Sequence, residues 1–164
     1  MPTTESLAIP GAGSIVVTLY EPAAMPRASV IVPCAMGVAQ RFYSRFAEWL
    51  ALQGFLAVTF DYRGTGLSAP RSLREFEVDI FGWAQQDCAA VIDYVKARLP
   101  AAPLYWIGHS LGGQLLGLIP NRHHIERIMT VATGSGYWLE NSWPTKRVVW
   151  WLWFVVVPIA LRVV

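Results

Sequence analysis

Residues 104–113, Leu-Tyr-Trp-Ile-Gly-His-Ser-Leu-Gly-Gly, decide the fold of this chain. Residues 104–107 form a short continuous apolar run, which is typical of a buried strand. A helix is predicted to begin near Leu111, so the strand turns directly into a helix at Ser110. Gly108 and Gly112 flank the serine at two residues on either side, and Gly113 adds clearance, as a tight and strained turn requires. The alternative is a glycine-rich turn that only lets strand and helix pack closely.

Strands and helices alternate on both sides of this turn. Residues 7–9 and 14–20 are predicted as an antiparallel hairpin, buried strands follow at residues 29–32 and 55–60, and a further strand is predicted at residues 125–132. Helices are predicted at residues 40–53, with Gly54 as the stop, from about Glu77 to Arg98, and from Leu111 to Pro120. The second helix has one apolar stripe: Phe81, Ala84, Cys88, Val91, Ile92 and Val95. Residues 133–145 are predicted as loop. The alternation predicts an α/β fold with three layers and a mostly parallel sheet.

Composition limits the classes of function. The chain has 164 residues, of which 54% are hydrophobic, and a net charge of +2 that is too small to indicate nucleic acid as a partner. Cys34 and Cys88 lie in apolar segments without metal-ligand spacing, so we expect buried free thiols in a reducing compartment. Residues 1–5 show neither the basic nor the apolar region of a signal peptide, which predicts a cytoplasmic protein.

The turn at Ser110 provides what a serine nucleophile needs. A hydroxyl reacts only when it is exposed, held rigidly and placed beside a base. At a helix N-terminus, unpaired N–H groups and the helix dipole stabilise a developing oxyanion. We therefore predict Ser110 as the catalytic nucleophile and the backbone amide of Leu111 as one donor to the oxyanion.

Two motifs together resemble the α/β-hydrolases, in particular the serine aminopeptidase and monoglyceride-lipase-like group. Residues 108–113, Gly-His-Ser-Leu-Gly-Gly, resemble the nucleophile motif, and residues 60–68, Phe-Asp-Tyr-Arg-Gly-Thr-Gly-Leu-Ser, resemble the loop after strand four. The resemblance covers roughly residues 5–140 and matches only the N-terminal portion of such an enzyme. It implies a serine hydrolase that acts on esters or amides, without cofactor or metal. It also implies a second oxyanion donor, the amide of Met36, in the loop of residues 34–37.

Asp61 and Arg63, in the second motif, have two interpretations. They could shape the rim of the active site. We favour a structural role, in which a carboxylate and a guanidinium fix the loop by hydrogen bonds.

The acid and the base of a catalytic triad are missing. In this fold they follow the serine in the order acid, then histidine. After Ser110 the chain has no aspartate, and its histidines are His123 and His124. We place these on the order of 15 Å or more from the serine, at ~1.5 Å per helical residue, beyond the reach of a base.

Three other side chains cannot serve as the acid or the base of the triad, each for a separate reason. His109 is adjacent to the serine and points elsewhere, Glu126 begins its strand at the wrong end, and Glu140 has no histidine to orient. We therefore expect a truncated piece of a longer hydrolase that is inactive alone, with a degenerate binding or scaffold protein as the alternative.

The C-terminal segment is rich in tryptophan. Val148 to Leu161 is an uninterrupted apolar run of 14 residues, with Pro158 inside it. We divide the chain into an α/β-hydrolase core at residues 1–142 and a cap, lid or interfacial helix at residues 143–164. As a lid, the segment would line an acyl or aromatic pocket, and core packing or membrane contact through residues 148–164 are the alternatives. The predicted lining residues are Tyr137, Trp138, Trp150, Trp151, Trp153 and Phe154.

Overall fold

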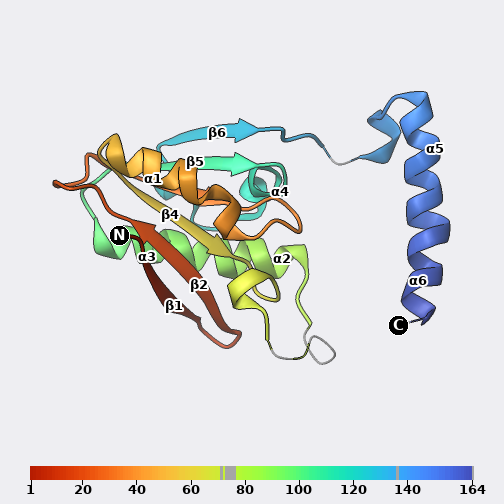
Figure 1. Cartoon of the computed structure of the whole chain (residues 1–164), viewed down its shortest axis with the longest axis horizontal. Coiled ribbons are helices and arrows are strands. Elements are labelled where there is room, and N and C mark those ends of the chain that lie inside the picture. The colour runs from red at the N-terminus through yellow and green to blue at the C-terminus, as the bar shows by residue number, and fades with distance from the viewer. Residues whose placement is uncertain (71, 73–76, 136, 164) are drawn as a thin grey trace. The chain divides into compact units, whose positions relative to one another are not determined.

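The computed structural model describes residues 1–70, 72, 77–135 and 137–163, and it divides into two compact units. Unit 1 is Met1–Thr133 and unit 2 is Gly134–Val164. Figure 1 shows the sheet and its helices in unit 1 and the helices α5 and α6 in unit 2. Ser110 and the motifs around it all belong to unit 1.

A six-stranded sheet forms the centre of unit 1, in the order β1-β2-β4-β3-β5-β6 (Figure 1). Strand β2 pairs antiparallel with β1 on one side and with β4 on the other. Strands β3, β4, β5 and β6 run parallel to one another. This confirms the mostly parallel α/β sheet and the opening hairpin. The strands are β1 Thr3–Ile9, β2 Gly13–Tyr20, β3 Ala28–Pro33, β4 Phe55–Asp61, β5 Leu104–His109 and β6 Arg127–Val131.

Helices cover both faces of the sheet. Because successive side chains of a strand point to opposite faces, Trp106 and Ile107 mark the two faces of β5. Ile107 shares a groove with Phe42 and Phe46, at the start of helix α1 (Ser44–Leu52), whereas the Trp106 indole donates to the carbonyl oxygen of Gly112 in helix α4 (Leu111–Gln114). The sheet therefore lies between α1 and α4, which confirms the three-layer architecture.

The second predicted helix begins later than the sequence suggests. Asp79 caps helix α2 (Ile80–Gly82) by accepting from the Gly82 amide at 2.8 Å, and a π-helical segment Trp83–Cys88 leads into α3 (Ala89–Arg98). Five residues of the predicted stripe are buried, but Phe81 is 51% exposed, so its placement in the stripe was wrong. Phe81 lies in the first turn, ahead of the part of the helix that covers the sheet.

The further strand predicted at residues 125–132 is confirmed as β6. All five of its residues are exposed, since no element among the described residues pairs with its outer edge. One further prediction needs correction. Residues 133–145 were expected to be loop, but a 3-10 turn forms at Trp138–Glu140 and helix α5 (Trp143–Trp151) already begins at Trp143. Pro144 lies in the first turn of α5, where its missing N–H costs nothing. A π-helical turn Leu152–Val156 connects α5 to α6 (Val157–Val163).

Candidate active site

Ser110 occupies a strained turn between β5 and α4. Its φ is +50° and its ψ is −112°, a backbone conformation that residues with a Cβ atom rarely adopt. The turn is held from several sides: the Ser110 amide donates to the Val131 carbonyl at 2.9 Å, and the Ser110 carbonyl accepts from the amides of Gly113 and Gln114. The surrounding structure therefore imposes this conformation on a partly exposed serine.

The two flanking glycines are required by close backbone approach. A Cβ atom on Gly108 would come within 2.6 Å of the Gly112 carbonyl oxygen, and one on Gly112 within 2.8 Å of the Pro33 carbonyl oxygen. Both distances are shorter than contacts that real Cβ atoms make. The second also shows that the turn lies directly against the end of β3, where the loop of residues 34–37 begins.

This loop and the first turn of α4 present free backbone donors. Within the described residues, the amides of Met36 and Leu111 donate to no acceptor, whereas the Ala35 amide donates to the Tyr43 hydroxyl at 2.9 Å. Gly37 takes the positive φ of the loop, +70°, so Ala35 needs no glycine-like conformation. Because β3 and β5 are parallel neighbours, both free donors stand at the carboxyl edge of the sheet where Ser110 lies.

His109 points away from the serine. Its Nδ1 atom is 2.8 Å from the Tyr43 hydroxyl oxygen, and the two rings meet edge to face. Tyr43 thereby links the turn at Ser110 to the loop of residues 34–37. Tyr43 was not identified from the sequence, because it lies 66 residues from His109 and no local pattern marks the contact.

The histidines after Ser110 lie at the opposite end of the sheet. His123 and His124 form a 3-10 turn that precedes β6, whereas Ser110 follows β5, and the two strands run parallel with Tyr105 beside Arg127 and His109 beside Val131. Five strand residues at ~3.3 Å each separate the two ends. Glu126 also lies at the far end, where its amide donates to the Leu104 carbonyl. In unit 2, Glu140 accepts a hydrogen bond from Ser135.

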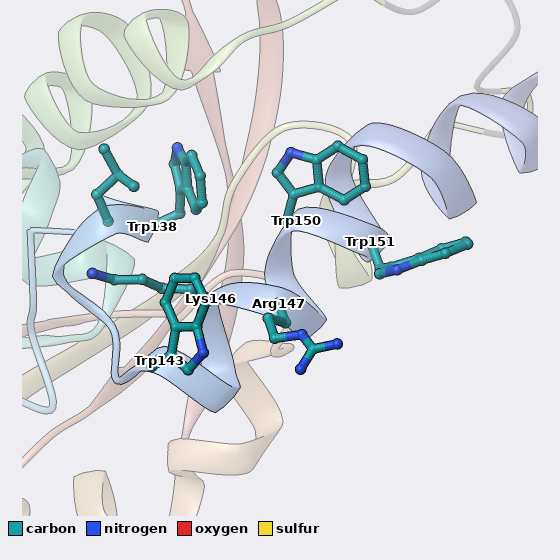
Figure 2. Close-up of a pocket in the computed structure, with 7 residues that line it drawn as sticks. Trp138, Trp143, Lys146, Arg147, Trp150 and Trp151 are labelled. Atoms are coloured by element: carbon teal, nitrogen blue, oxygen red, sulfur yellow. The ribbon is translucent and has the colours of Figure 1, made fainter.

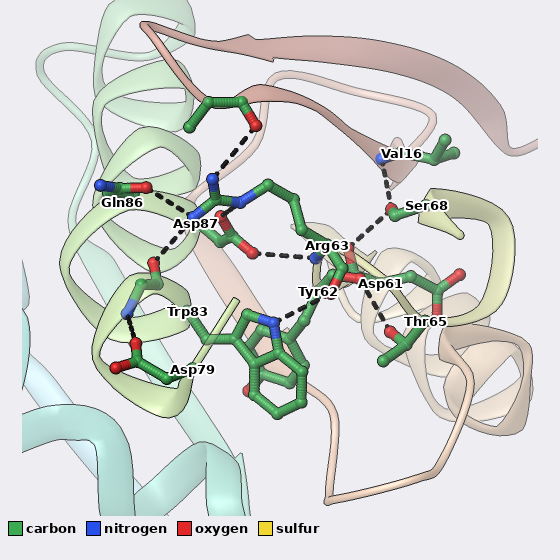
Figure 3. A network of polar contacts seen from close by, with 12 residues as sticks. Val16, Asp61, Tyr62, Arg63, Thr65, Ser68, Asp79, Trp83, Gln86 and Asp87 are labelled. Atoms are coloured by element: carbon green, nitrogen blue, oxygen red, sulfur yellow. Dashed lines mark hydrogen bonds and ion pairs between the residues drawn. The ribbon is translucent and has the colours of Figure 1, made fainter. Parts of the chain in front are cut away.

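Asp61 holds the loop after β4 in place. Its carboxylate accepts from the Gln40 amide at 2.8 Å, the Gln40 side chain at 3.0 Å and the Leu67 amide at 2.9 Å. Ser68 donates to the Asp61 carbonyl and accepts from the Val16 amide (Figure 3). The structural role of Asp61 is confirmed.

Arg63 belongs to a second buried network, shown in Figure 3. Its Nε donates to the Asp87 carboxylate at 2.5 Å, and its guanidinium also reaches Gln86 and the carbonyls of Ala12 and Gly82. Burial raises the pKa of Asp87, and the contacts with Arg63 oppose that rise. Both side chains are almost completely buried, so the pair fixes the loop rather than a substrate. Asp87 was not singled out from the sequence, since one aspartate on a helix carries no local signal.

The two cysteines are free and buried, as predicted. Burial raises the pKa of both thiols, and the Cys34 thiol donates to the Phe60 carbonyl at 3.0 Å. Thiols of this kind are poor nucleophiles.

Each of the two units has a strongly apolar cavity. A groove of about 370 Å³ between α1 and the sheet runs beside the turn at Ser110 and is lined by Val32, Phe42, Tyr43, Phe46, Ile107, His109, Met129 and Val131. A cavity of about 350 Å³ in unit 2 is lined by Trp138, Leu139, Trp143, Lys146, Arg147, Trp150 and Trp151 (Figure 2). Of the predicted lining residues, Trp138, Trp150 and Trp151 line this second cavity. Tyr137, Trp153 and Phe154 are exposed and are not among its lining residues.

Comparison with known proteins identifies the family. Residues 24–161 match the sequence profile described as "Serine aminopeptidase, S33". The chain belongs to the serine aminopeptidase S33 family. A monoglyceride lipase homolog from Monkeypox virus is 26% identical over 96 residues, which are 58% of this chain and 34% of that protein. The S33 chain therefore spans about a third of the length of this curated relative.

Solved α/β-hydrolase structures confirm the fold. A thermostable carboxyl esterase from Bacillus coagulans matches with a TM-score of 0.69 at 20% identity, over 79% of this chain and 43% of the esterase. A soluble variant of monoglyceride lipase from Saccharomyces cerevisiae matches with a TM-score of 0.67 at 20% identity, over 79% of this chain and 44% of the lipase. An α/β serine hydrolase from Xanthomonas campestris is described as having no lid. It matches with a TM-score of 0.68 at 23% identity, over 84% of this chain and 63% of that hydrolase. The S33 chain therefore has the α/β-hydrolase fold.

Proposed function

We propose that Ser110 is the nucleophile of a serine hydrolase that acts on carboxylic esters or amides. The observation that carries the proposal is the strained, partly exposed Ser110 at φ +50°, beside the free amides of Met36 and Leu111. In the proposed reaction, the Ser110 Oγ attacks the substrate carbonyl, and the resulting oxyanion accepts hydrogen bonds from these two amides. A base must accept the hydroxyl proton during this attack.

The acid and the base come from outside this chain in our proposal. Within the described residues, no histidine that could take the Ser110 proton has a carboxylate partner, because His109 bonds Tyr43 and His123 and His124 precede β6. We propose that the chain is the N-terminal part of a longer cytoplasmic enzyme and turns over esters poorly alone. A non-catalytic binding or scaffold protein is the alternative.

The proposed substrates are small, rather apolar esters or amides. The relatives named above include a monoglyceride lipase and a carboxyl esterase, and the groove beside the nucleophile turn is almost entirely apolar. For residues 143–164 two roles are candidates: a lid whose aromatic side chains, together with Tyr137 and Trp138, line an acyl or aromatic pocket, or contact with a membrane through residues 148–164. In the lid role, Trp150 and Trp153 are the principal candidates on the helix for lining this pocket.

A fluorophosphonate probe tests the nucleophile directly. The chain is incubated with the probe with and without imidazole, which substitutes for a missing base, and labelling is mapped by mass spectrometry. We expect slow labelling at Ser110 that imidazole accelerates, none at Ser110 in Ser110→Ala, and none at the exposed Ser6. Absence of labelling at Ser110 with imidazole, or equal labelling at Ser6, would overturn the proposal and favour the scaffold.

A nitrophenyl-ester assay without imidazole tests the inactivity of the chain alone. We expect rates no higher than those of Ser110→Ala. A higher rate would show that a base within this chain reaches the serine.

A further inference from the structure

The helix of unit 2 exposes an unusual amount of apolar surface. Among the described residues, Trp143–Arg162 is the one helix that is long and apolar enough to cross a membrane, with 20 residues and a mean hydropathy of 1.3. None of its most apolar window is buried within the protein. Such a surface marks a site of interaction with a partner or a membrane.

The aromatic and basic side chains share one side of this helix. Trp143, Lys146, Arg147, Trp150 and Trp151 line a single cavity, so they project to the same side (Figure 2). Phe154 continues this side, with its ring centre 5.9 Å from that of Trp150. Within the described residues, the indole N–H groups of Trp143, Trp150 and Trp151 donate to no protein acceptor.

Aliphatic side chains occupy the other side. At ~100° per residue, positions four apart in an α-helix lie nearly one above the other, so Val148 and Leu152 share the side opposite the aromatic residues. Val156 follows about one turn later, at the end of the π-helical turn Leu152–Val156. These three residues are between 47% and 59% exposed. The helix therefore has an aliphatic face and a face that combines tryptophan with positive charge.

This distribution matches the layers of a phospholipid surface. Tryptophan prefers the headgroup level, where its ring is in contact with apolar groups and its N–H meets carbonyl oxygens. Lysine and arginine at that level attract anionic headgroups, and aliphatic side chains favour the acyl region. A second protein chain could cover the aliphatic face. It would not explain why Lys146 and Arg147 lie among three indoles whose N–H groups are unpaired.

The apolar length favours a helix in the plane of the surface over one that spans the bilayer. The uninterrupted apolar run from Val148 to Leu161 has 14 residues, which is ~21 Å of helix against a hydrocarbon thickness of ~30 Å. Extending the span toward Trp143 would bury Lys146 and Arg147 in hydrocarbon, which is unfavourable.

We propose that Trp143–Arg162 lies in the surface of an anionic phospholipid bilayer. Val148, Leu152 and Val156 insert among the acyl chains, and the tryptophans with Lys146 and Arg147 occupy the headgroup layer. The proposal does not depend on Ser110 as nucleophile, because it rests on unit 2 alone. It would place the hydrolase unit of the same chain beside apolar substrates that partition into lipid.

Vesicle flotation tests the proposal with the full chain. We expect the chain to float with phosphatidylcholine vesicles containing 30% phosphatidylglycerol and to bind neutral phosphatidylcholine vesicles more weakly. Substitution of both Lys146→Gln and Arg147→Gln should weaken binding to anionic vesicles about 30-fold, since each basic residue contributes ~1 kcal/mol. Leu152→Ser with Val156→Ser should weaken binding to both vesicle types at least tenfold. Leu52→Gln, at an exposed leucine outside the helix, is the matched control and should bind like the unchanged protein.

The depth of the helix in the bilayer is measured by quenching of tryptophan fluorescence with brominated lipids. We expect stronger quenching by bromine near the headgroups than by bromine near the ends of the acyl chains. Stronger quenching by the deep position would show a spanning helix and overturn the proposal, as would a failure of the chain to float with anionic vesicles. In either case the labelling of Ser110 without lipid is unaffected, so the two proposals fail independently.

Discussion

Backbone strain at Ser110 has a measurable consequence for stability. A residue with a Cβ atom in this conformation costs ~1–3 kcal/mol, and glycine adopts it freely. Glycine also lowers stability by ~0.5–1 kcal/mol relative to alanine, because it loses more chain entropy on folding. Since Ser110 has φ +50°, Ser110→Gly should exceed Ser110→Ala in free energy of unfolding by about 0.5–2 kcal/mol.

Urea and thermal unfolding, followed by circular dichroism, measure this difference. At ~2–4 °C per kcal/mol for a chain of this size, the two midpoints should differ by about 1–8 °C. Ala132, which also has φ +50°, is a positive control, and Ala132→Gly should raise stability. Ala97 is exposed in helix α3, and Ala97→Gly should lower stability by ~1 kcal/mol. A Ser110→Gly protein no more stable than Ser110→Ala, with both controls behaving as expected, would refute the strained turn.

Three further predictions follow from buried contacts. Asp87→Ala leaves the buried Arg63 guanidinium without its carboxylate and should lower the free energy of unfolding by ~3–5 kcal/mol in urea titration; a loss below 1 kcal/mol would contradict the buried pair. Cys34 and Cys88 should react with a thiol reagent such as dithionitrobenzoate only after unfolding, because burial raises the pKa of both thiols; rapid reaction in the native protein would show an open core. Gly113→Ala places a Cβ atom against the Thr133 hydroxyl and should cost ~1–3 kcal/mol through overpacking, whereas an unchanged melting temperature would show that the loop after β6 yields freely.

Local sequence determined the alternation of strands and helices and the position of the tight turn at Ser110. Apolar runs of four to six residues mark β3, β4 and β5 because a strand buried on both faces excludes polar side chains. The spacing of Gly108, Ser110 and Gly112 marks the turn, because only small residues allow the backbone to approach itself so closely. These signals are local, so they can be read without knowledge of what packs around them.

Contacts between distant segments could not be predicted in the same way. The Tyr43 hydroxyl joins Ala35 and His109, and Asp87 pairs with Arg63 across 24 residues. The residues of β6 include Ile128, Met129 and Val131, yet all five are exposed, since burial depends on which element lies beside the strand.

The sequence by itself therefore determined the fold and the serine, because backbone sterics and hydrophobic periodicity act over a few neighbouring residues. Only the tertiary structure decided which amides remain unpaired beside Ser110 and which side chains fix the loops. Those outcomes depend on strands that lie together in the sheet, although they are far apart in the chain.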